Sequence, residues 1–269
     1  MELTHARTFL LDGDGVLWHG DRAAPGFNRF FDLLSARGIR WGLLTNNATR
    51  GAEALAAKFK GFGVEVDEGS IFTSATATAM YLRRNFLAGS PIFVVGEVGL
   101  KDTLAAAGYS IDDGLDETVE VPAVVVGLDR NLSYDKIKKA MRLILRGAAF
   151  IATNPDTSFP GPDGLAPGAG SVIAAVTTAA GVEPRFMGKP GAPLFEVAME
   201  TFHAIPDTTV MVGDRLDTDI QGAHQLGLGS ALVLSGVSRR EDIDRLGIIP
   251  DLVVDDLAAL ADALERLAV

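Results

Sequence analysis

The sequence predicts an α/β fold, a doubly wound parallel sheet of the Rossmann-like type with helices on both faces. Short apolar segments of strand length alternate with helix-like segments over most of the chain. Hydrophobic residues make up 48% of the 269 residues, enough to bury a sheet on both sides. Strands that alternate with helices form parallel sheets, because each helix carries the chain back across one face of the sheet.

The predicted elements follow one another in a regular order along the chain. The short apolar runs predict strands at Thr8–Leu11, Ile39–Leu44, Ile71–Thr73, Pro91–Val95, Ala123–Leu128, Phe150–Thr153, Thr209–Val212 and Ala231–Leu234. The segments between them predict helices at Gly26–Ala36, Arg50–Phe62, Thr76–Asn85, Val98–Ala107, Ser133–Arg146, Ser171–Ala180, Pro193–Phe202 and Asp219–Leu226. The Gly- and Pro-rich segment Phe159–Gly170 is predicted to be an irregular loop, which at this length is usually functional or mobile, with a plain surface loop as the alternative.

The composition excludes several classes of function. The formal net charge of −11 argues against a nucleic-acid or anionic membrane surface, which needs clustered Lys and Arg. The chain has no cysteine, so a disulfide, a zinc-thiolate site and a cysteine nucleophile are ruled out, as suits a cytoplasmic protein. We also expect no signal peptide and no membrane-spanning segment, because no apolar run is long enough.

Two carboxylates stand at the end of the first predicted strand. Asp12 and Asp14 directly follow Thr8–Leu11, and the glycines beside them permit a sharp turn. A carboxylate at a strand end is costly to bury unless a cation compensates its charge. It can also act as a nucleophile toward phosphorus, with the second carboxylate near the leaving group. The alternative is a polar turn with two solvated acids.

A second acidic cluster follows the strand Thr209–Val212. Asp214 comes directly after that strand and Gly213, and Asp219 follows five residues later. Together with the first cluster, these acids predict an all-oxygen site of the kind that Mg²⁺ prefers. The alternative is the acidic N-terminus of a helix, where carboxylates favour the helix dipole.

Further polar residues follow other strands or lie in rigid surroundings. A hydroxyl and backbone N–H groups at Thr45 and Asn46 suit a phosphoryl group, although capping of the next helix is an alternative. Lys189, between a glycine and a proline, offers an ammonium that can neutralise carboxylates and hold phosphate, with a surface lysine as the alternative. Asn154 also directly follows a predicted strand, at the edge where parallel sheets bind ligands.

These motifs occur in a characteristic order. The pattern Asp-x-Asp-Gly, Thr-Asn, Gly-Lys-Pro and Gly-Asp-x-x-x-x-Asp resembles the haloacid dehalogenase superfamily of phosphohydrolases. Asp12 and Thr45 are 33 positions apart, whereas Thr45 and Lys189 are 144 apart, which leaves room for an inserted domain. With Thr153-Asn154-Pro155-Asp156, this spacing is similar to the NagD-like and 4-nitrophenylphosphatase-like branch, which has a large α/β (C2-type) cap. The resemblance implies a hydrolase core at 1–81 and 184–269 and a smaller α/β cap at 82–183.

The resemblance also implies a magnesium-dependent phosphomonoesterase. In that mechanism Asp12 attacks the phosphorus, and Asp14 protonates the leaving alcohol and then activates the water that hydrolyses the aspartyl-phosphate. Mg²⁺ is held by the Asp12 carboxylate, the Asp14 backbone carbonyl and Asp214. Asp219 does not bind the ion itself but orients a metal-bound water or Lys189. The remaining implied roles are phosphoryl binding by Thr45, Asn46 and Lys189, and selection of the leaving group by Asn154 and Asp156.

The implied substrate is a small phosphorylated metabolite, such as a sugar phosphate, a nucleoside monophosphate or a phosphoglycolate-like ester. Neither nucleic acid nor a membrane is an expected partner, and a homodimer remains open. Two rivals also remain. A phosphomutase of the same fold keeps both acids but typically carries a different cap, and a non-catalytic phosphate or magnesium sensor would bind the ion without releasing phosphate. A dehalogenase usually lacks the second acid, so Asp14 argues against it.

Overall fold

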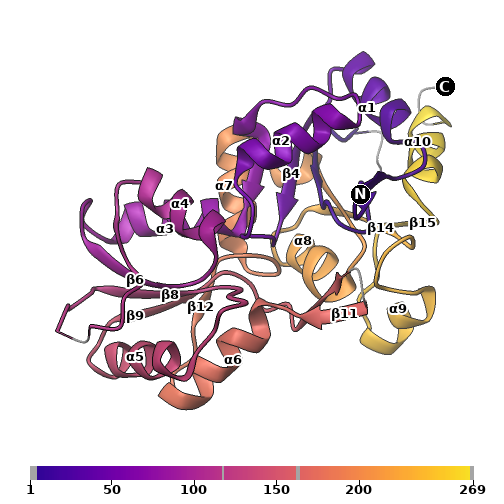
Figure 1. The fold of residues 1–269 in the computed structure, drawn as a ribbon. Coiled ribbons are helices and arrows are strands. Elements are labelled where there is room, and N and C mark those ends of the chain that lie inside the picture. The colour runs from indigo at the N-terminus through magenta and orange to yellow at the C-terminus, as the bar shows by residue number, and fades with distance from the viewer. Residues whose placement is uncertain (1–4, 117, 162–163, 267–269) are drawn as a thin grey trace. The chain divides into compact units, whose positions relative to one another are not determined.

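The computed structural model describes residues 5–116, 118–161 and 164–266 (Figure 1). The chain divides into two compact units. The first comprises Met1–Thr45, Ala52–Phe72 and Pro190–Val269, and the second comprises Asn46–Gly51 and Thr73–Lys189. Each unit is built around its own sheet, so the two are described separately.

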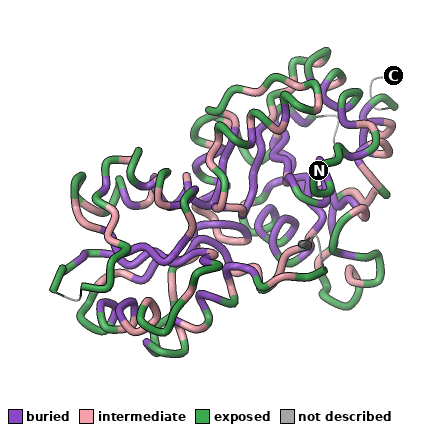
Figure 2. Tube along the Cα trace, viewed as in Figure 1, coloured by how far each residue is buried: buried purple, intermediate pink, exposed green. Residues whose placement is uncertain are grey.

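The first unit contains a six-stranded sheet with β1 near its centre. Strand β1 (Thr8–Leu11) pairs in parallel with β13 and β4, so that Leu10 lies beside Met211 and Gly42. Strands β1 and β13 are buried along their whole length (Figure 2). From edge to edge the order is β15 (Leu252–Val254), β14 (Gly229–Val233), β13 (Thr209–Gly213), β1, β4 (Arg40–Thr45) and β5 (Ile71–Thr73).

Helices cover both faces of this sheet. The face that carries Phe9 and Leu11 packs against α1 (Phe27–Ala36), α2 (Ala52–Gly61) and α10 (Leu257–Arg266). Aromatic rings pack against one another in this layer. Phe30 meets Phe9 edge to face at 6.2 Å, and Phe31 contacts the rings of Phe27 and Phe59. The opposite face packs against α7 (Ala192–Phe202) and α8 (Gln221–Gln225), and α9 (Arg240–Leu246) lies between β14 and β15 in the sequence.

The second unit contains a five-stranded parallel sheet. Helices α3 (Ser74–Asn85) and α4 (Val98–Ala106) lie on one face, and α5 (Tyr134–Leu145) and α6 (Ala169–Ala180) lie on the other (Figure 1). The strand order is β12 (Arg185–Phe186), β9 (Ala149–Ala152), β8 (Ala123–Val126), β6 (Pro91–Val95) and β7 (Ser110–Asp112). Apolar side chains of β6, β8 and β9 form a core with those of α5 and α6.

Helix α5 also buries a charged group beside this core. Lys139 is 1% exposed, and its ammonium donates to Asp112 Oδ2 at 2.8 Å and to the Gly114 carbonyl at 3.0 Å. The same ammonium lies 4.6 Å from the centre of the Phe93 ring. A buried ammonium is tolerated only with such partners, so this ion pair ties α5 to the edge strand β7.

These observations confirm the predicted α/β class with Rossmann-like parallel sheets. The placement of the predicted strands and helices agrees closely with the structure, apart from two segments. The assignment of 82–183 as a cap and of the rest as the hydrolase core stays a prediction. No helix in the described part of the chain combines the length and the apolar composition that a bilayer crossing requires.

The prediction of an irregular loop at Phe159–Gly170 is wrong. Strands β10 (Ser158–Gly161) and β11 (Gly164–Pro167) form an antiparallel hairpin there, with Phe159 opposite Ala166, and α6 begins at Ala169. The residues of the turn, 162 and 163, lie outside the described residues. Glycine and proline mark the ends of short hairpin strands as readily as they mark loops, so composition alone did not separate the two.

The predicted helix at Asp219–Leu226 is wrong at its start. A π-helical turn, η4 (Leu216–Ile220), comes first, and α8 follows it. Other elements that the sequence did not predict are the helices α9 and α10 and the short elements β2 (Trp18–His19), β3 (Arg22–Ala23), β7, β12, β15 and the 3-10 turns η2 (Glu68–Ser70) and η3 (Pro206–Thr208).

Candidate active site

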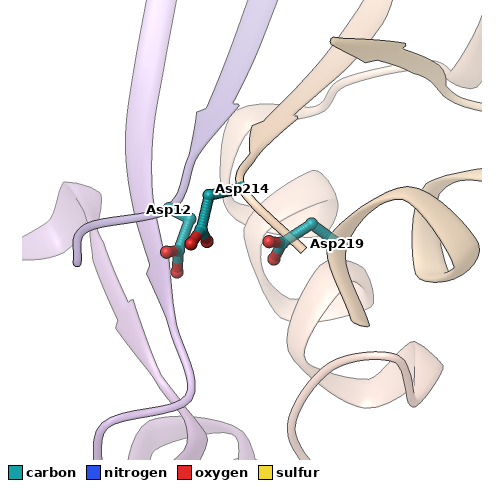
Figure 3. Close-up of side chains that lie close together, drawn as sticks. All are labelled: Asp12, Asp214 and Asp219. Carbon is teal, nitrogen blue, oxygen red and sulfur yellow. The ribbon is translucent and has the colours of Figure 1, made fainter. Parts of the chain in front are cut away.

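Three carboxylates meet at the carboxyl edge of the first sheet. Asp12 directly follows β1 and donates its backbone N–H to the Val212 carbonyl at 2.9 Å, which continues the pairing with β13. Because β1 and β13 are parallel neighbours, Asp12 and Asp214 end up side by side. One carboxylate oxygen each from Asp12, Asp214 and Asp219 lies within 4.8 Å of the others (Figure 3). The exposed fractions of Asp214 and Asp219 are only 2% and 1%.

The π-helical turn η4 brings Asp219 to this edge. The Ile220 backbone N–H reaches the Arg215 carbonyl five residues back, at 3.2 Å. The Arg215 N–H donates to Asp219 Oδ2 at 3.1 Å and orients the carboxylate. A Cβ at Gly213 would lie 2.2 Å from the Asp219 Cβ, so this close approach requires glycine at the end of β13. Such π-turns within helical segments are frequent at functional sites.

The loop after β14 encloses the Asp214 carboxylate. The Val237 N–H donates to Asp214 Oδ2 at 2.7 Å. A Cβ at Gly15 or Gly236 would lie only 2.5 or 1.9 Å from the same oxygen, and Gly15 also has a φ of +89°. The Ser235 hydroxyl donates to the Gly15 carbonyl at 2.8 Å and joins this loop to the turn after β1. Backbone atoms therefore hold Asp214 from both sides.

This donor set fits a magnesium ion. Three like charges so close together, two of them on almost fully buried side chains, repel one another and favour a bound cation. All three groups offer carboxylate oxygen, the hard ligand that Mg²⁺ prefers over nitrogen or sulfur. The structure brings the carboxylates of Asp12, Asp214 and Asp219 together, and the assignment of Asp12 and Asp214 as metal ligands and of Asp219 as a group that orients a water or the lysine stays a prediction.

Asp14 occupies a different position from these three acids. Its side chain is exposed, and its Oδ1 accepts a hydrogen bond from the Trp18 indole N–H at 3.0 Å. A tight turn sets this contact, because the Gly13 carbonyl accepts from the backbone N–H groups of Leu17 and Trp18 at 2.9 and 3.2 Å. A Cβ at Gly13 would lie 2.6 Å from the Trp18 ring.

Trp18 is itself held firmly. Trp18 is 2% exposed, and its ring meets the Phe59 ring edge to face at 5.3 Å. The Lys58 ammonium lies 4.2 Å from the centre of the Trp18 ring. The indole N–H is thus a fixed donor on an otherwise apolar side chain. It holds the Asp14 carboxylate at the rim of the first sheet.

Four other predicted site residues gather in the second unit. Asn46, Asn154 and Lys189 are 8%, 5% and 2% exposed, and Asp156 is partly buried. Asn46 Nδ2 donates to Asp156 Oδ2 at 3.1 Å, and Asn154 Nδ2 donates to the Asn46 carbonyl at 2.7 Å. The burial of Lys189 excludes the alternative of a surface lysine.

Thr45 is the last residue of β4 in the first unit and is 5% exposed. It lies on the strand next to β1, at the same edge as Asp12. Helix α2 begins only at Ala52, so Thr45 does not cap it. Most of the predicted residues therefore fall into two sets, an acidic set in the first unit and a set of amides, a carboxylate and a lysine in the second. Asp14 and Thr45 lie in the first unit, outside the acidic set.

The sequence reasoning missed two features of the site. Trp18 was not assigned a role, and no short motif marks an indole as a partner of Asp14. The loop that holds Asp214 could have been found, because Ser235 and Gly236 follow the predicted strand Ala231–Leu234, just as the predicted site residues follow theirs.

Comparison with known families agrees with this geometry. A haloacid dehalogenase-like hydrolase model matches residues 9–110, and a second HAD-hydrolase-like model matches residues 186–260. Among curated proteins, the chain is 40% identical over 255 residues to a dihydroxyacetone phosphatase of Corynebacterium glutamicum, covering 95% of this chain and 90% of the relative. It is 37% identical to the ribonucleotide monophosphatase NagD of Escherichia coli, covering 94% of this chain and 98% of NagD.

Solved structures lead to the same family. The 4-nitrophenylphosphatase of Thermotoga maritima superposes with a TM-score of 0.90 at 35% identity, covering 97% of this chain and 98% of that one. A glycerol phosphate phosphatase of Mycobacterium tuberculosis, solved in complex with magnesium, gives 0.87 at 31% identity, covering 98% and 79% of the two chains.

The chain belongs to the haloacid dehalogenase-like hydrolases. Within them it is similar to the NagD-like and 4-nitrophenylphosphatase-like proteins, as the motif spacing predicts. The prediction of an enzyme that acts on phosphoric monoesters is confirmed at the level of this class.

Proposed function

We propose that this protein is a magnesium-dependent phosphomonoesterase that works through a phosphorylated aspartate, Asp12. The observation that carries the proposal is the cluster of Asp12, Asp214 and Asp219 at the carboxyl edge of the first sheet, two of them almost fully buried. Carboxylates this close are costly to bury without a cation, and a nucleophilic carboxylate among them has a clear chemical use.

The proposed reaction has two steps. An oxygen of the Asp12 carboxylate attacks the phosphorus in line, while the bond from phosphorus to the ester oxygen breaks and Asp14 gives that oxygen its proton. Asp14, now ionised, takes a proton from a water molecule that attacks the same phosphorus. The bond between phosphorus and Asp12 then breaks, which regenerates the carboxylate and releases inorganic phosphate. The Trp18 indole supports the role of Asp14, because it holds that carboxylate at a fixed place.

Asp12, Asp214 and the Asp14 backbone carbonyl would hold the magnesium ion, with Asp219 beside them. When bound, the ion supplies positive charge that offsets the carboxylates and the phosphate. Val237 and the glycines around Asp214 keep that carboxylate oriented for binding.

The transferring phosphoryl group needs positive charge and hydrogen-bond donors. We assign this task to the Thr45 hydroxyl, to Asn46 and to the Lys189 ammonium, in line with the family resemblance. Asn154 and Asp156 are assigned to the leaving-group side. Their support is the hydrogen-bonded network that joins Asp156 and Asn154 to Asn46 in the second unit.

The proposed substrate is a small phosphorylated metabolite. The relatives are named for dihydroxyacetone, ribonucleotide monophosphates and glycerol phosphate. A cytoplasmic location and a homodimer both stay predictions.

Release of inorganic phosphate from a panel of phosphomonoesters, with and without magnesium, tests the proposal. We expect magnesium-dependent release that disappears in Asp12→Asn, which removes the nucleophilic oxygen but keeps the size of the side chain. Asp32→Asn, an exposed aspartate on α1, is the matched control and should behave as wild type. Full activity of Asp12→Asn would refute the assigned nucleophile.

Two other outcomes distinguish the rivals. Transfer between positions of one substrate, stimulated by a bisphosphate activator, would identify a phosphomutase. Binding of magnesium with no release of phosphate from any ester would identify a sensor.

A further inference from the structure

The side chain of Asn46 is fully used by the protein itself. Its Oδ1 accepts from the Lys189 backbone N–H at 2.8 Å, and its Nδ2 donates to the Lys189 carbonyl at 3.0 Å. The second amide hydrogen is directed to Asp156 Oδ2 at 3.1 Å. A primary amide has two hydrogens to donate, and both have acceptors here.

This arrangement bears on what Asn46 can do for a phosphoryl group. A side-chain contact to phosphate would require Asn46 to release either Lys189 or Asp156. Breaking a buried hydrogen bond leaves its partner unsatisfied, which is costly at a site where Asn46 is 8% and Lys189 2% exposed. The Asn46 amide is therefore held by these protein contacts and is poorly suited to meet phosphate itself.

We propose that Asn46 is a positioning residue, which holds the backbone of Lys189 in place and links it to Asp156. The inference rests on the proposed function, because it explains how the phosphoryl-binding lysine is oriented. The Asn46 amide bonds both the N–H and the carbonyl of Lys189, as the backbone of a neighbouring strand would. These two bonds fix the Lys189 backbone and therefore the point from which its side chain extends. The same amide fixes Asp156, which ties the leaving-group side to the phosphoryl side.

The surroundings of Asn46 are built for this contact. A Cβ at Gly188 would lie 2.5 Å from Asn46 Oδ1 and 2.7 Å from the Thr153 carbonyl, so only glycine allows the approach. The Gly188 N–H donates to the Thr153 carbonyl at 2.7 Å. The Asn46 carbonyl accepts from the Ser74 hydroxyl at 2.7 Å, which fixes the residue from its backbone side.

A double-mutant cycle with Lys189 separates positioning from direct contact. Asn46→Ala should lower kcat at least tenfold in the wild-type background. In the Lys189→Ala background the same change should lower kcat less than twofold, because the side chain that Asn46 positions is already gone. Equal losses in the two backgrounds would show that Asn46 acts on the phosphoryl group by itself and would overturn the proposal.

Asn46→Asp serves as a second variant. It keeps an acceptor for the Lys189 N–H but places a carboxylate oxygen against the Lys189 carbonyl and the Asp156 carboxylate, so it should lose as much kcat as Asn46→Ala. The matched control is Asn131→Asp, an exposed residue of the same unit. It should retain wild-type kcat.

Amide hydrogen exchange provides a readout that does not need turnover. Exchange at the Lys189 N–H should rise at least tenfold in Asn46→Ala and stay unchanged in Asn131→Asp, with thermal unfolding confirming that each variant is folded. Unchanged exchange in Asn46→Ala overturns the inference even if the protein is a phosphatase. Faster exchange in a protein that hydrolyses no ester would instead refute the proposed function and leave the Asn46–Lys189 contact standing.

Discussion

The two units place opposite kinds of polar cluster at the carboxyl edges of their parallel sheets. The first unit gathers three carboxylates from β1, β13 and η4, and their shared negative charge calls for a cation. The second unit gathers Asn46, Asn154, Asp156 and the backbone of Lys189, which are joined by hydrogen bonds within the protein. The same edge geometry thus yields a cluster of carboxylates in one unit and a hydrogen-bonded network of amides, a carboxylate and a lysine backbone in the other.

The two clusters are also held in place by different groups. In the first unit the ligand-binding atoms are held by backbone N–H groups and by close-packed glycines. In the second unit the Asn46 amide holds the backbone of Lys189 and the carboxylate of Asp156. Substitutions at equivalent glycines should therefore affect different quantities, metal affinity in one unit and turnover in the other.

The largest expected effect comes from Gly236→Ala in the first unit. Its Cβ would lie 1.9 Å from Asp214 Oδ2, so that carboxylate must move away from its position. We expect the affinity for magnesium, measured by calorimetry, to fall about 10–100-fold, the usual cost of disturbing the groups that orient a ligand. Gly61→Ala is the control, because a Cβ there meets no atom within 4 Å. Wild-type magnesium affinity in Gly236→Ala would show that this loop does not hold Asp214.

The corresponding change in the second unit is Gly188→Ala. Its Cβ would displace the Asn46 amide from Lys189, so kcat should fall about tenfold, equivalent to about 1.4 kcal/mol. Magnesium affinity should stay within twofold of wild type. Gly51→Ala, where a Cβ has open space, is the control. A loss of metal affinity as large as that of Gly236→Ala would remove the distinction between the two units.

Trp18→Phe should have a smaller effect that depends on the leaving group. It removes the indole N–H from Asp14 and keeps an aromatic ring. With an alkyl phosphate, whose leaving alcohol needs a proton, the rate of the first step, measured in a single turnover, should fall about threefold to tenfold. With 4-nitrophenyl phosphate, whose leaving group departs as an anion, the rate of that step should change little. Trp41→Phe, the other tryptophan, is the control, and equal losses with both esters would contradict the role of Trp18.

The smallest effect on turnover is expected for Lys139→Met, which acts on stability. It leaves Asp112 without its buried ammonium partner, and the free energy of unfolding should fall by about 3–5 kcal/mol. Urea titration followed by circular dichroism measures the change, while kcat below the transition should stay near wild type. Lys138→Met, the neighbouring and more exposed lysine, should change stability by less than about 0.5 kcal/mol. Equal stability of the two variants would show that the buried pair contributes little.

Much of the fold could be predicted because its signal is local. Each long strand is a run of apolar residues, and β1 and β6 begin and end where the sequence predicts. Short strands such as β12 and β15 were not predicted, because two or three residues seldom show a pattern above chance. Their pairing depends on the longer strands beside them, which the sequence does not reveal.

The candidate site shows the same division. Asp12, Thr45 and Asp214 could be found because each follows a predicted strand, and such ends collect at one edge of a sheet. Asn154 follows a predicted strand of the second sheet in the same way. Asp219 reaches the cluster only through a π-helical turn, which shares its residue types with an ordinary helix start. Trp18 reaches Asp14 only through a tight turn around Gly13.

The sequence by itself therefore determined the fold class, the family and the chemical nature of the groups at the strand ends. These depend on periodicity and on residue types that lie close together in the chain. The tertiary structure decided which groups meet. Asn46 and Lys189 are 143 residues apart, and their contact exists only after two strand ends and two loops have packed together. The reason is physical, because local propensities act over a few residues, whereas the partners of a buried polar group are chosen by the packing of the whole unit.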